Sequence, residues 1–249
     1  MLKEERQKMI IKEINLHNKV LSTDLSLLLK VSDDTIRRDL KELVDSGKIL
    51  KVHGGAVSPS FVSTFTTQTD VYAAEEKKRI VQKALKLIKN NSVIVTEGGT
   101  TMLELARMIP DHIKATFFTI SPQVAITLSE HSNLDVVTIG GKLVKNANLH
   151  IGSAVINRLA ELRADICFLG ANAFSVKDGL TDVDWEVVQV KKALIRCAKK
   201  VVVMTISEKL DTVQRLNICG IDKVDYLITE LPVNSDILKP YQNTNLVLL

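Results

Sequence analysis

The sequence predicts a mixed α/β protein with a small N-terminal winged helix-turn-helix domain and a larger α/β domain whose sheet is mainly parallel. In the first part, helical periodicity stops at Gly47 and a strand-like alternation leads to Gly54-Gly55. In the second part, apolar strand-like runs alternate with helical segments. A hydroxyl-rich stretch containing proline separates the two parts. We therefore expect domains at 1–57 and 75–249, joined by a linker at 58–74.

Three helical patterns occupy most of the first domain. Their apolar stripes comprise Leu2, Met9, Ile10 and Ile14 in the first helix, Leu25, Leu28 and Leu29 in the second, and Ile36, Leu40, Leu43 and Val44 in the third. Ser32 suits the N-cap of the third helix, and Gly47 suits the left-handed residue at its end. Only Lys30 and Val31 separate the second and third helices, which is typical of a helix-turn-helix.

The third helix and the segment after it have the features of a DNA-reading surface. Arg37, Arg38 and Lys41 lie off the apolar stripe, where their cations can reach phosphates or the acceptors of guanine. The alternating segment before Gly54-Gly55 predicts a hairpin that forms a wing. We expect DNA contacts from Ser32, Asp34, Thr35, Arg37, Arg38, Lys41, Lys51 and His53.

Charge alone does not establish DNA binding. Residues 1–57 carry 11 Lys and Arg against 9 Asp and Glu, a net charge of only +2, so a three-helix scaffold with a solvated basic face is the alternative. The placement of the cations on the third helix and wing favours DNA binding. Asp33 and Asp34 suit the positive end of the helix dipole, and Asp34 could also accept from the amine of cytosine.

Composition excludes several classes of protein. With 45 % hydrophobic residues and a mean hydropathy of +0.11, the 249 residues can bury a sizeable core. No apolar run approaches the ~20 residues of a membrane span, so we expect a cytoplasmic protein with no membrane partner. The three cysteines, Cys167, Cys197 and Cys219, are odd in number and widely spaced, which predicts buried free thiols. We expect neither a metal site nor a cofactor.

The second domain has the alternation of a covered parallel sheet. Strands are expected at 92–96, 115–120, 134–139, 166–169, 201–206, 226–229 and 246–249, with helices at 75–90 and 101–108, from Pro122, and at 184–199. The strands are apolar on both faces, as in parallel sheets covered by helices on each side. Small-molecule sites in such sheets lie beyond the carboxyl ends of the strands.

One strand end has the composition of an anion cradle. The segment 96–101, Thr-Glu-Gly-Gly-Thr-Thr, runs from a strand directly into a helix. Its glycines allow close approach to the backbone, its threonines supply hydroxyls, and the helix N-terminus supplies N–H groups, which together suit phosphate. The alternative is an ordinary strand-to-helix turn with Thr100 as its N-cap. The segment lacks the lysine of a Walker loop and the spacing of a dinucleotide fingerprint.

Polar residues and glycines follow the other expected strands, where they could bind the hydroxyls of a sugar. A cation could reach the anion from another strand end, and Lys191, Lys192 and Lys209 are candidates. The predicted ligand site comprises Glu97, Gly98, Gly99, Thr100, Thr101, Gly140, Gly141, Lys142, Asn172, Asp178, Gly179, Asp184 and Lys209.

Two groups of motifs resemble one known family over nearly the whole chain. The first is Val31-Ser32, Thr35-Ile36-Arg37-Arg38-Asp39-Leu40, Gly47 and His53-Gly54-Gly55-Ala56; the second is Glu75-Glu76-Lys77, Gly99-Thr100-Thr101, Gly140-Gly141, Gly152, 165–170 and Asp178-Gly179-Leu180-Thr181. Together they resemble the DeoR family of bacterial transcriptional regulators. The resemblance implies a sensor domain with the fold of ribose-5-phosphate isomerases, a sugar-phosphate effector and a homo-oligomer.

The chain departs from the family pattern at three places. Glu97-Gly98 replaces the usual aspartate before the Gly-Thr-Thr turn, and Thr119-Ile120 replaces Thr-Asn. The segment 205–209, Thr-Ile-Ser-Glu-Lys, replaces Asp-x-Ser-Lys, so Lys209 corresponds only with a shift of one residue. These departures bear on the identity of the effector more than on the fold.

The resulting hypothesis is a repressor of carbohydrate catabolism genes without catalytic residues. Its expected partners are operator double-stranded DNA, a phosphorylated sugar and further copies of itself, as a dimer or tetramer. One alternative is a sugar-phosphate isomerase or deaminase fused to a DNA-binding domain, with Asp178, Asp184 or Glu186 as the base. Another is an adaptor whose sheet serves only for oligomerisation.

Overall fold

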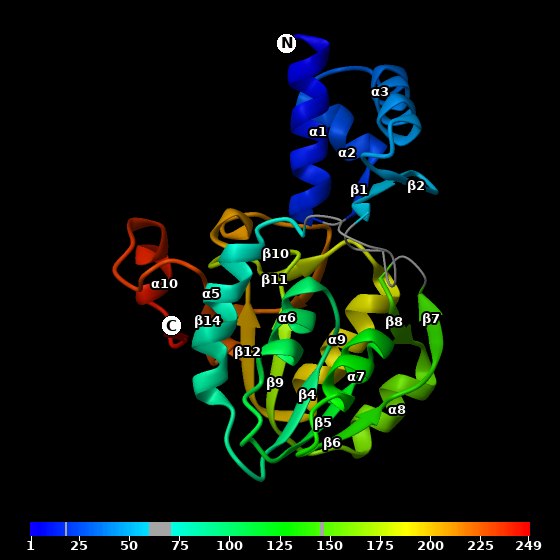
Figure 1. The fold of residues 1–249 in the computed structure, drawn as a ribbon. Helices are drawn as coiled ribbons and strands as arrows, with labels where there is room; N and C mark the ends of the chain where they lie inside the picture. The colour runs from blue at the N-terminus through cyan, green and yellow to red at the C-terminus, as the bar shows by residue number, and fades with distance from the viewer. Residues whose placement is uncertain (18, 60–70, 145–146) are drawn as a thin grey trace. The chain divides into compact units, whose positions relative to one another are not determined.

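A computed structural model describes residues 1–17, 19–59, 71–144 and 147–249 of the chain. These residues form two compact units, Met1–Tyr72 and Ala73–Leu249, called unit 1 and unit 2 below (Figure 1). Most of the linker predicted at 58–74 lies outside the described residues.

Unit 1 has the predicted winged helix-turn-helix fold. Its elements are α1 (Lys3–His17), β1 (Lys19–Leu21), α2 (Ser22–Leu29), α3 (Asp33–Asp45), β2 (Leu50–Val52) and β3 (Gly55–Val57). The Ser32 hydroxyl caps α3 by accepting the Thr35 N–H at 3.3 Å, and Gly47 has a φ of +71° just beyond the helix. The wing strands β2 and β3 pair antiparallel. Strand β1, which extends this sheet, was not predicted because three residues show no clear periodicity.

The apolar core of unit 1 is narrower than the sequence stripes indicated. Ile10 and Ile14 of α1 pack with residues of the other helices, among them Leu25 and Ile36. The prediction was wrong for Leu2, Met9 and Leu28, whose exposed fractions are 71 %, 44 % and 53 %. Leu2 precedes α1, and the other two lie next to Ile10 and Leu29, which occupy the inward direction on their helices.

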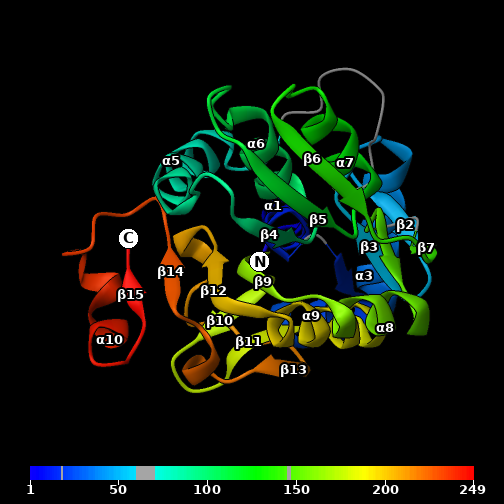
Figure 2. The ribbon, with the colours of Figure 1, turned by 90° about the horizontal axis from the view of Figure 1, so that it is seen from below.

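Unit 2 is built on a seven-stranded sheet in the order β15-β14-β12-β9-β4-β5-β6. All neighbouring strands in it pair parallel, which confirms the predicted sheet. Figure 2 shows α5 and α6 on one face of the sheet and α8 and α9 on the other. The strands are β4 (Val93–Thr96), β5 (Ala115–Thr119), β6 (Leu134–Thr138), β9 (Ala164–Gly170), β12 (Ala198–Met204), β14 (Tyr226–Ile228) and β15 (Val247–Leu248).

The helices of unit 2 connect these strands. They are α5 (Ala74–Ala84), α6 (Thr100–Met108), α7 (Pro122–Ser129), α8 (Ser153–Glu161), α9 (Trp185–Arg196) and α10 (Lys239–Gln242), with 3-10 turns η1 (Leu85–Leu87), η2 (Ser207–Lys209), η3 (Ile221–Lys223) and η4 (Asp236–Leu238). The helix predicted at 75–90 is therefore too long, because the chain tightens into η1 after Ala84. The N-cap of α6 is Gly99 rather than Thr100.

Short strands account for most of what the periodicity missed. The hairpin β7 (Lys142–Val144) and β8 (Leu149–Ile151) follows β6, and β10 (Ala173–Ser175), β11 (Gly179–Asp182) and β13 (Leu216–Cys219) form a separate antiparallel sheet. Helix α8 was also not predicted. Strands of three or four residues are too short for an alternating pattern to identify them.

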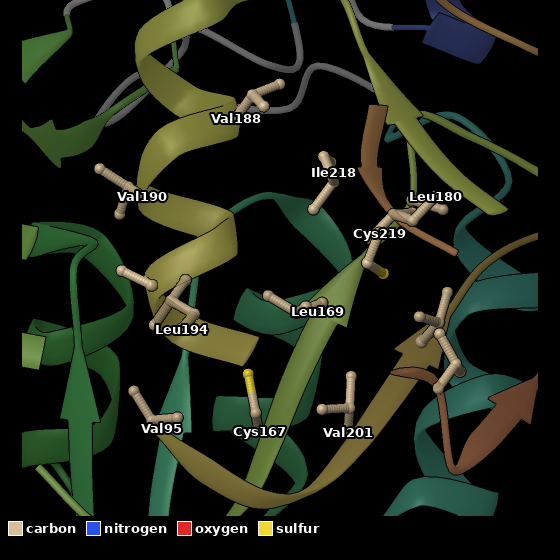
Figure 3. Close-up of a cluster of buried hydrophobic side chains, with 14 of the residues drawn as sticks. Val95, Cys167, Leu169, Leu180, Val188, Val190, Leu194, Val201, Ile218 and Cys219 are labelled. Carbon is tan, nitrogen blue, oxygen red and sulfur yellow. The ribbon is translucent and has the colours of Figure 1, made fainter. Parts of the chain in front are cut away.

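One apolar core of unit 2 lies between α9, the parallel sheet and the small sheet. Figure 3 shows Leu194 of α9 directed toward Leu169 and Cys167 of β9, with Cys219 of β13 nearby. All three cysteines are free and buried, as predicted. Because burial disfavours the thiolate, the pKa of Cys197 and that of Cys219 are raised to about 11.

The described helices include none with both the length and the apolarity that a membrane crossing demands.

Candidate nucleic-acid interface and candidate anion site

The exposed face of α3 carries the predicted DNA-reading cations. Arg37, Arg38 and Lys41 are exposed, whereas the residues packed beneath them are Ile36, Leu40 and Leu43. This division follows from the helical period, which places the apolar positions three and four residues apart on one face. The geometry allows the three cations to enter a groove while the opposite face stays packed in unit 1.

The polar residues at the start of α3 also contact one another. The hydroxyls of Ser32 and Thr35 lie 2.9 Å apart, and the Asp34 carboxylate lies 3.6 Å from the Arg37 guanidinium. The Asp34 and Arg37 side chains are largely exposed, so this ion pair is weak and either member can exchange it for another partner.

The wing places two further predicted residues beside α3. Helix α3 and strand β2 lie side by side in unit 1, as Figure 1 shows. Lys51 is exposed on β2, and His53 is exposed in the turn before β3. Gly54 has a φ of +75°, and a side chain on Gly55 would overlap the carbonyl oxygen of Val20. Gly54 therefore permits the tight reversal that presents Lys51 and His53, and Gly55 permits β1 to lie close against β3.

In unit 2, the turn from β4 into α6 has the form of an anion cradle. Gly99 has a φ of +91° and open space where a side chain would stand. The first turn of any α-helix leaves N–H groups without intrahelical acceptors, and here those groups begin at Thr100 and Thr101. Gly98 is buried, and a Cβ atom there would come within 2.6 Å of Leu149 and 2.9 Å of Ser121. The backbone can approach this close only because residue 98 is glycine.

Next to this turn lies a buried ion cluster formed by Glu97, Asp182 and Lys191. The Lys191 ammonium nitrogen lies 3.3 Å from a Glu97 oxygen and 3.1 Å from an Asp182 oxygen. Glu97 also accepts the N–H of Gly170 at the end of β9. Asp182 accepts the Asn172 amide at 3.1 Å. The cluster therefore joins the ends of β4, β9 and β11 to α9.

The three ionisable groups of the cluster differ in the direction of their pKa shifts. Burial raises the pKa of Glu97, against the attraction of Lys191 and the Gly170 hydrogen bond. Burial also disfavours the charge on Asp182, but Lys191 and hydrogen bonds from the Val183 N–H and the Asn172 amide hold its pKa below the ordinary value. Against its own burial, the two carboxylates raise the pKa of Lys191. Lys191 and Asp182 are thus a stable charged pair, and Glu97 is the acid most easily protonated.

Two further lysines, Lys209 and Lys77, lie near the cluster. Lys209 is buried and donates to the carbonyl of Ala171, the residue after Gly170, at 3.0 Å. Burial, together with the positive charges of Lys77 and Lys191, lowers the pKa of Lys209 to about 7. Lys77 lies in the first turns of α5, and burial lowers its pKa to about 8. A bound anion would stabilise both lysines in their charged forms.

The structure brings together some of the residues predicted for the ligand site. The carboxylate of Glu97 and the ammonium of Lys209 bind successive residues at the end of β9, and Asn172 follows directly. Gly98, Gly99, Thr100 and Thr101 continue from Glu97 into α6.

Other predicted ligand residues have structural roles away from the cluster. Asp178 binds Ser175 within the turn between β10 and β11. Gly179 has a φ of +67°, and a Cβ there would lie 2.1 Å from the Cys219 carbonyl oxygen. Asp184 caps α9 by accepting the N–H groups of Glu186 and Val187.

The remaining predicted residues lie on the hairpin that follows β6. A Cβ on Gly141 would lie 2.7 Å from the Ile151 carbonyl oxygen, so this glycine permits close packing of β7 and β8, whereas Gly140 faces open space. Lys142 forms an exposed ion pair of 3.7 Å with Glu186.

The prediction missed Lys77 and gave no weight to the pairing of Lys191 with Asp182. A usable signal was present for both lysines. Lys191 lies three or four residues from Val187, Val188 and Leu194, and Lys77 lies three and four residues from Ile80 and Val81. A lysine within the apolar stripe of a helix loses part or all of its contact with water, as Lys77 and Lys191 do, and a buried charge needs a specific partner.

The fold, the cationic face of α3 and the candidate anion site of unit 2 together define a class of protein. This class is a winged-helix DNA-binding regulator joined to an α/β sensor unit. Comparison with protein families agrees. Residues 6–62 match the DeoR-like helix-turn-helix domain, and residues 72–231 match the DeoR C-terminal sensor domain. The chain belongs to the DeoR family of transcriptional regulators.

Curated relatives match along almost their whole length. The chain is 33 % identical to the HTH-type transcriptional regulator GolR of Listeria innocua, over 97 % of this chain and 96 % of that protein. It is 32 % identical to the regulator GlpR of Haloferax volcanii, over 95 % and 93 %. It is 30 % identical to the glycerol-3-phosphate regulon repressor of Escherichia coli, over 92 % and 91 %.

Among solved structures, the likenesses are more distant. Ribose 5-phosphate isomerase A of Methanocaldococcus jannaschii matches with a TM-score of 0.38 and 19 % identity, over 54 % of this chain and 53 % of that chain. The initiation factor eIF-2B of Pyrococcus horikoshii matches with a TM-score of 0.45 and 14 % identity, over 92 % and 90 %.

Proposed function

We propose that this regulator represses carbohydrate catabolism genes and that a phosphorylated sugar bound to unit 2 changes its affinity for operator DNA. Two observations carry the proposal. The glycine turn at the N-terminus of α6 is open, and the buried Lys209 binds Ala171, the residue after the one that Glu97 of this turn contacts. The name of the Escherichia coli relative, a glycerol-3-phosphate regulon repressor, supports a phosphorylated effector.

On the DNA side, we propose that Arg37, Arg38 and Lys41 read the groove while Lys51 and His53 contact phosphates from the wing. The exposure of all five side chains supports this division. Ser32 and Thr35 shape the start of α3, where their hydroxyls lie 2.9 Å apart, so their direct contribution to base contacts is smaller. Asp34 also contributes less, because phosphates repel its carboxylate.

On the sensor side, we propose that the phosphate binds the N–H groups at Thr100 and Thr101 and the ammonium groups of Lys209 and Lys77. Asp182, Asn172 and Glu97 line the side toward the sugar, where carboxylate and amide groups can bind hydroxyls. Lys209 is buried and Lys77 is half-buried, and both have lowered pKa values. They gain their charge most readily when a dianion enters, which favours a phosphate monoester over a neutral sugar.

We propose no catalytic role for unit 2. The bases suggested by the sequence have other tasks: Asp184 caps α9, Asp178 binds Ser175, and Glu186 pairs with Lys142. A carboxylate engaged in this way is a poor general base.

We also propose a cytoplasmic homo-oligomer, a dimer or a tetramer, because helix-turn-helix regulators commonly use two reading heads on two half-sites. Sedimentation of the full chain measures the subunit number, and a monomer at every concentration would contradict this part of the proposal.

The decisive experiment is a mobility shift on DNA from upstream of the protein's own gene, titrated with a panel of sugar phosphates and glycerol 3-phosphate. We expect at least one phosphate to change operator affinity by about 5- to 150-fold, the usual range of such coupling. The same sugars without phosphate should have no effect. If no compound alters the shift, effector control is excluded while DNA binding stands.

A pair of variants locates the effector site. Thr100→Val removes a hydroxyl beside the cradle and should abolish the effector response while leaving operator affinity unchanged. Thr127→Val is the matched control, because the Thr127 hydroxyl binds the Gln123 carbonyl inside α7, away from the cradle. An unchanged response in the Thr100 variant would place the anion elsewhere.

A further inference from the structure

The first half of α1 is joined to α3 by polar side chains rather than by apolar packing. No residue from Lys3 to Met9 is buried. Instead, Lys3 pairs with Glu42 of α3 at 2.7 Å, and Gln7 donates to Glu42 at 2.9 Å. The contacts nearest the core belong to Arg6, which binds both carboxylate oxygens of Asp39 at 2.5 and 3.2 Å. We call these five residues the α1–α3 seam.

Within the seam, Arg6 and Asp39 are shielded from water. The exposed fractions of their side chains are 13 % and 2 %. Asp39 follows Arg38 directly in the sequence. Because an α-helix turns by about 100° per residue, the Asp39 side chain points in a different direction from that of Arg38. An acidic residue next to two DNA-reading arginines is therefore turned inward and neutralised, whereas an unpaired carboxylate there would repel phosphates and would be costly to bury.

The geometry of this pair restricts how α3 can rotate. Apolar packing in the core is non-directional, so Ile36, Leu40 and Leu43 tolerate small rotations of α3 about its axis. A guanidinium that binds both oxygens of one carboxylate fixes distance and plane together. Because Asp39 lies one residue after Arg38, any rotation that displaces Asp39 from Arg6 also displaces Arg38 from its place on the DNA-facing surface.

We propose that Arg6 is a positioning residue for DNA recognition, which sets the rotation of α3 by holding Asp39 and does not itself contact DNA. Arg6 acts on sequence-specific binding, which depends on the exact direction of the α3 side chains. It has little effect on non-specific binding, which depends on charge near phosphates.

The test compares two variants that each remove one positive charge from α1. Arg6→Gln breaks the pair with Asp39, whereas Lys8→Gln removes an exposed cation from the same helix. We expect Arg6→Gln to weaken operator binding by about tenfold or more and to leave binding to random DNA nearly unchanged, with Lys8→Gln changing neither by more than about twofold. Equal, small losses in the two variants would overturn the proposal.

The salt dependence of operator binding separates positioning from direct contact. A residue that contacts a phosphate reduces the slope of log K against log salt by about one when it is removed. We expect the slope of Arg6→Gln to equal that of the unaltered protein. A slope reduced by about one would show that Arg6 contacts the DNA backbone, which contradicts the proposal.

A double variant separates positioning from simple folding. Arg6→Gln with Asp39→Asn leaves no unpaired charge in the seam, so unit 1 keeps its fold even if Arg6→Gln alone loses it. We expect this folded double variant to lose specific binding as Arg6→Gln does, and Arg6→Lys to recover part of the loss. Operator affinity of the double variant equal to that of the unaltered protein would show that Arg6 serves only to neutralise Asp39.

Discussion

The two units of this protein hold their candidate binding cations in opposite environments. In unit 1, Arg37, Arg38 and Lys41 are exposed to water on one helix. In unit 2, Lys191 and Lys209 are buried at strand ends, and their charge depends on the carboxylates or anions that approach them. The first arrangement suits a long polyanion at the surface, and the second suits a small anion that is removed from water.

This contrast explains why the pKa of Lys209 is low: Lys209 is buried in unit 2, whereas the arginines of α3 lie in water. Solvent screens exposed charges, so their contribution to folding is small and their binding varies with salt. Buried charges interact strongly, so the loss of one partner affects stability as well as binding. The predictions below test this difference, beginning with the largest effect.

Loss of the central buried cation should cost the most. Lys191→Met leaves Glu97 and Asp182 buried without their shared ion partner and should reduce the free energy of unfolding of unit 2 by about 3–5 kcal/mol. Chemical denaturation followed by the fluorescence of Trp185, the single tryptophan of the chain, reports on unit 2. Lys192→Met, on the neighbouring and more exposed lysine, should unfold at nearly the same denaturant concentration as the unaltered protein. Equal midpoints for all three proteins would refute a structural role for the cluster.

Loss of an exposed reading cation should affect DNA and not stability. Arg38→Ala should weaken operator binding by about 1–3 kcal/mol, while affinity for random DNA changes little and the unfolding midpoint stays the same. Titrations of both DNAs by fluorescence anisotropy measure the difference. Equal losses on operator and random DNA would contradict base reading by Arg38.

The lowered pKa values of Lys209 and Lys77 should make anion binding depend on pH. An anion binds their charged forms, and the pKa values of about 7 for Lys209 and about 8 for Lys77 mean that each loses its proton as the pH rises through that range. The affinity for an effector phosphate should therefore fall, on the order of tenfold between pH 7 and pH 9, with proton uptake on binding. Calorimetry in buffers of different ionisation enthalpy measures that uptake, and Lys209→Gln should lose most of it.

The lowered pKa values of Lys209 and Lys77 also make the stability of unit 2 depend on pH, in the direction opposite to the affinity for the anion. The unfolded chain, with ordinary lysine pKa values, binds more protons than the folded chain above pH 7, so these two lysines make ligand-free unit 2 more stable as the pH rises toward 10. Denaturation curves at pH 7 and pH 9 test this. Between these two pH values, the free energy of unfolding should rise more for the unaltered protein than for Lys209→Gln. A pH-independent affinity for the phosphate would show that neither lysine is at the anion site.

The smallest effect is expected at the wing. Lys51→Ala should weaken operator and random DNA alike, by about two- to threefold at moderate salt, and should reduce the slope of log K against log salt by about one. Replacement of Lys12, an exposed lysine of α1, by alanine is the control and should leave the slope unchanged. A loss confined to the operator would instead assign base reading to Lys51.

The fold of unit 1 could be predicted from the sequence almost entirely because its signals are local. The cap at Ser32, the turn after Leu29 and the stop at Gly47 each depend on residues a few positions apart. Even there, the pairing of Arg6 with Asp39 was not predicted, since 33 residues separate them. A motif gives the identity of a residue, but it does not give its distant partner.

In unit 2 the sequence predicted the parallel sheet and the glycine turn, but it gave only part of the site. Asp178 and Asp184 follow strands and carry the right chemistry, yet they stabilise a turn and a helix end. Asp182 and Lys191 are the residues that meet Glu97 in the buried cluster. Several carboxylates in one loop look equivalent in sequence, and only packing decides which of them is buried.

The sequence by itself determined the class of each unit and the exposed cations of α3, because helical periodicity, capping and turn formation act over a few residues. The tertiary structure alone decided which charges are buried together at the strand ends, and that Arg6 is the partner of Asp39. Those choices depend on burial and on pairing between distant residues. Electrostatic interactions become strong enough to matter there only when folding removes water from around the charges.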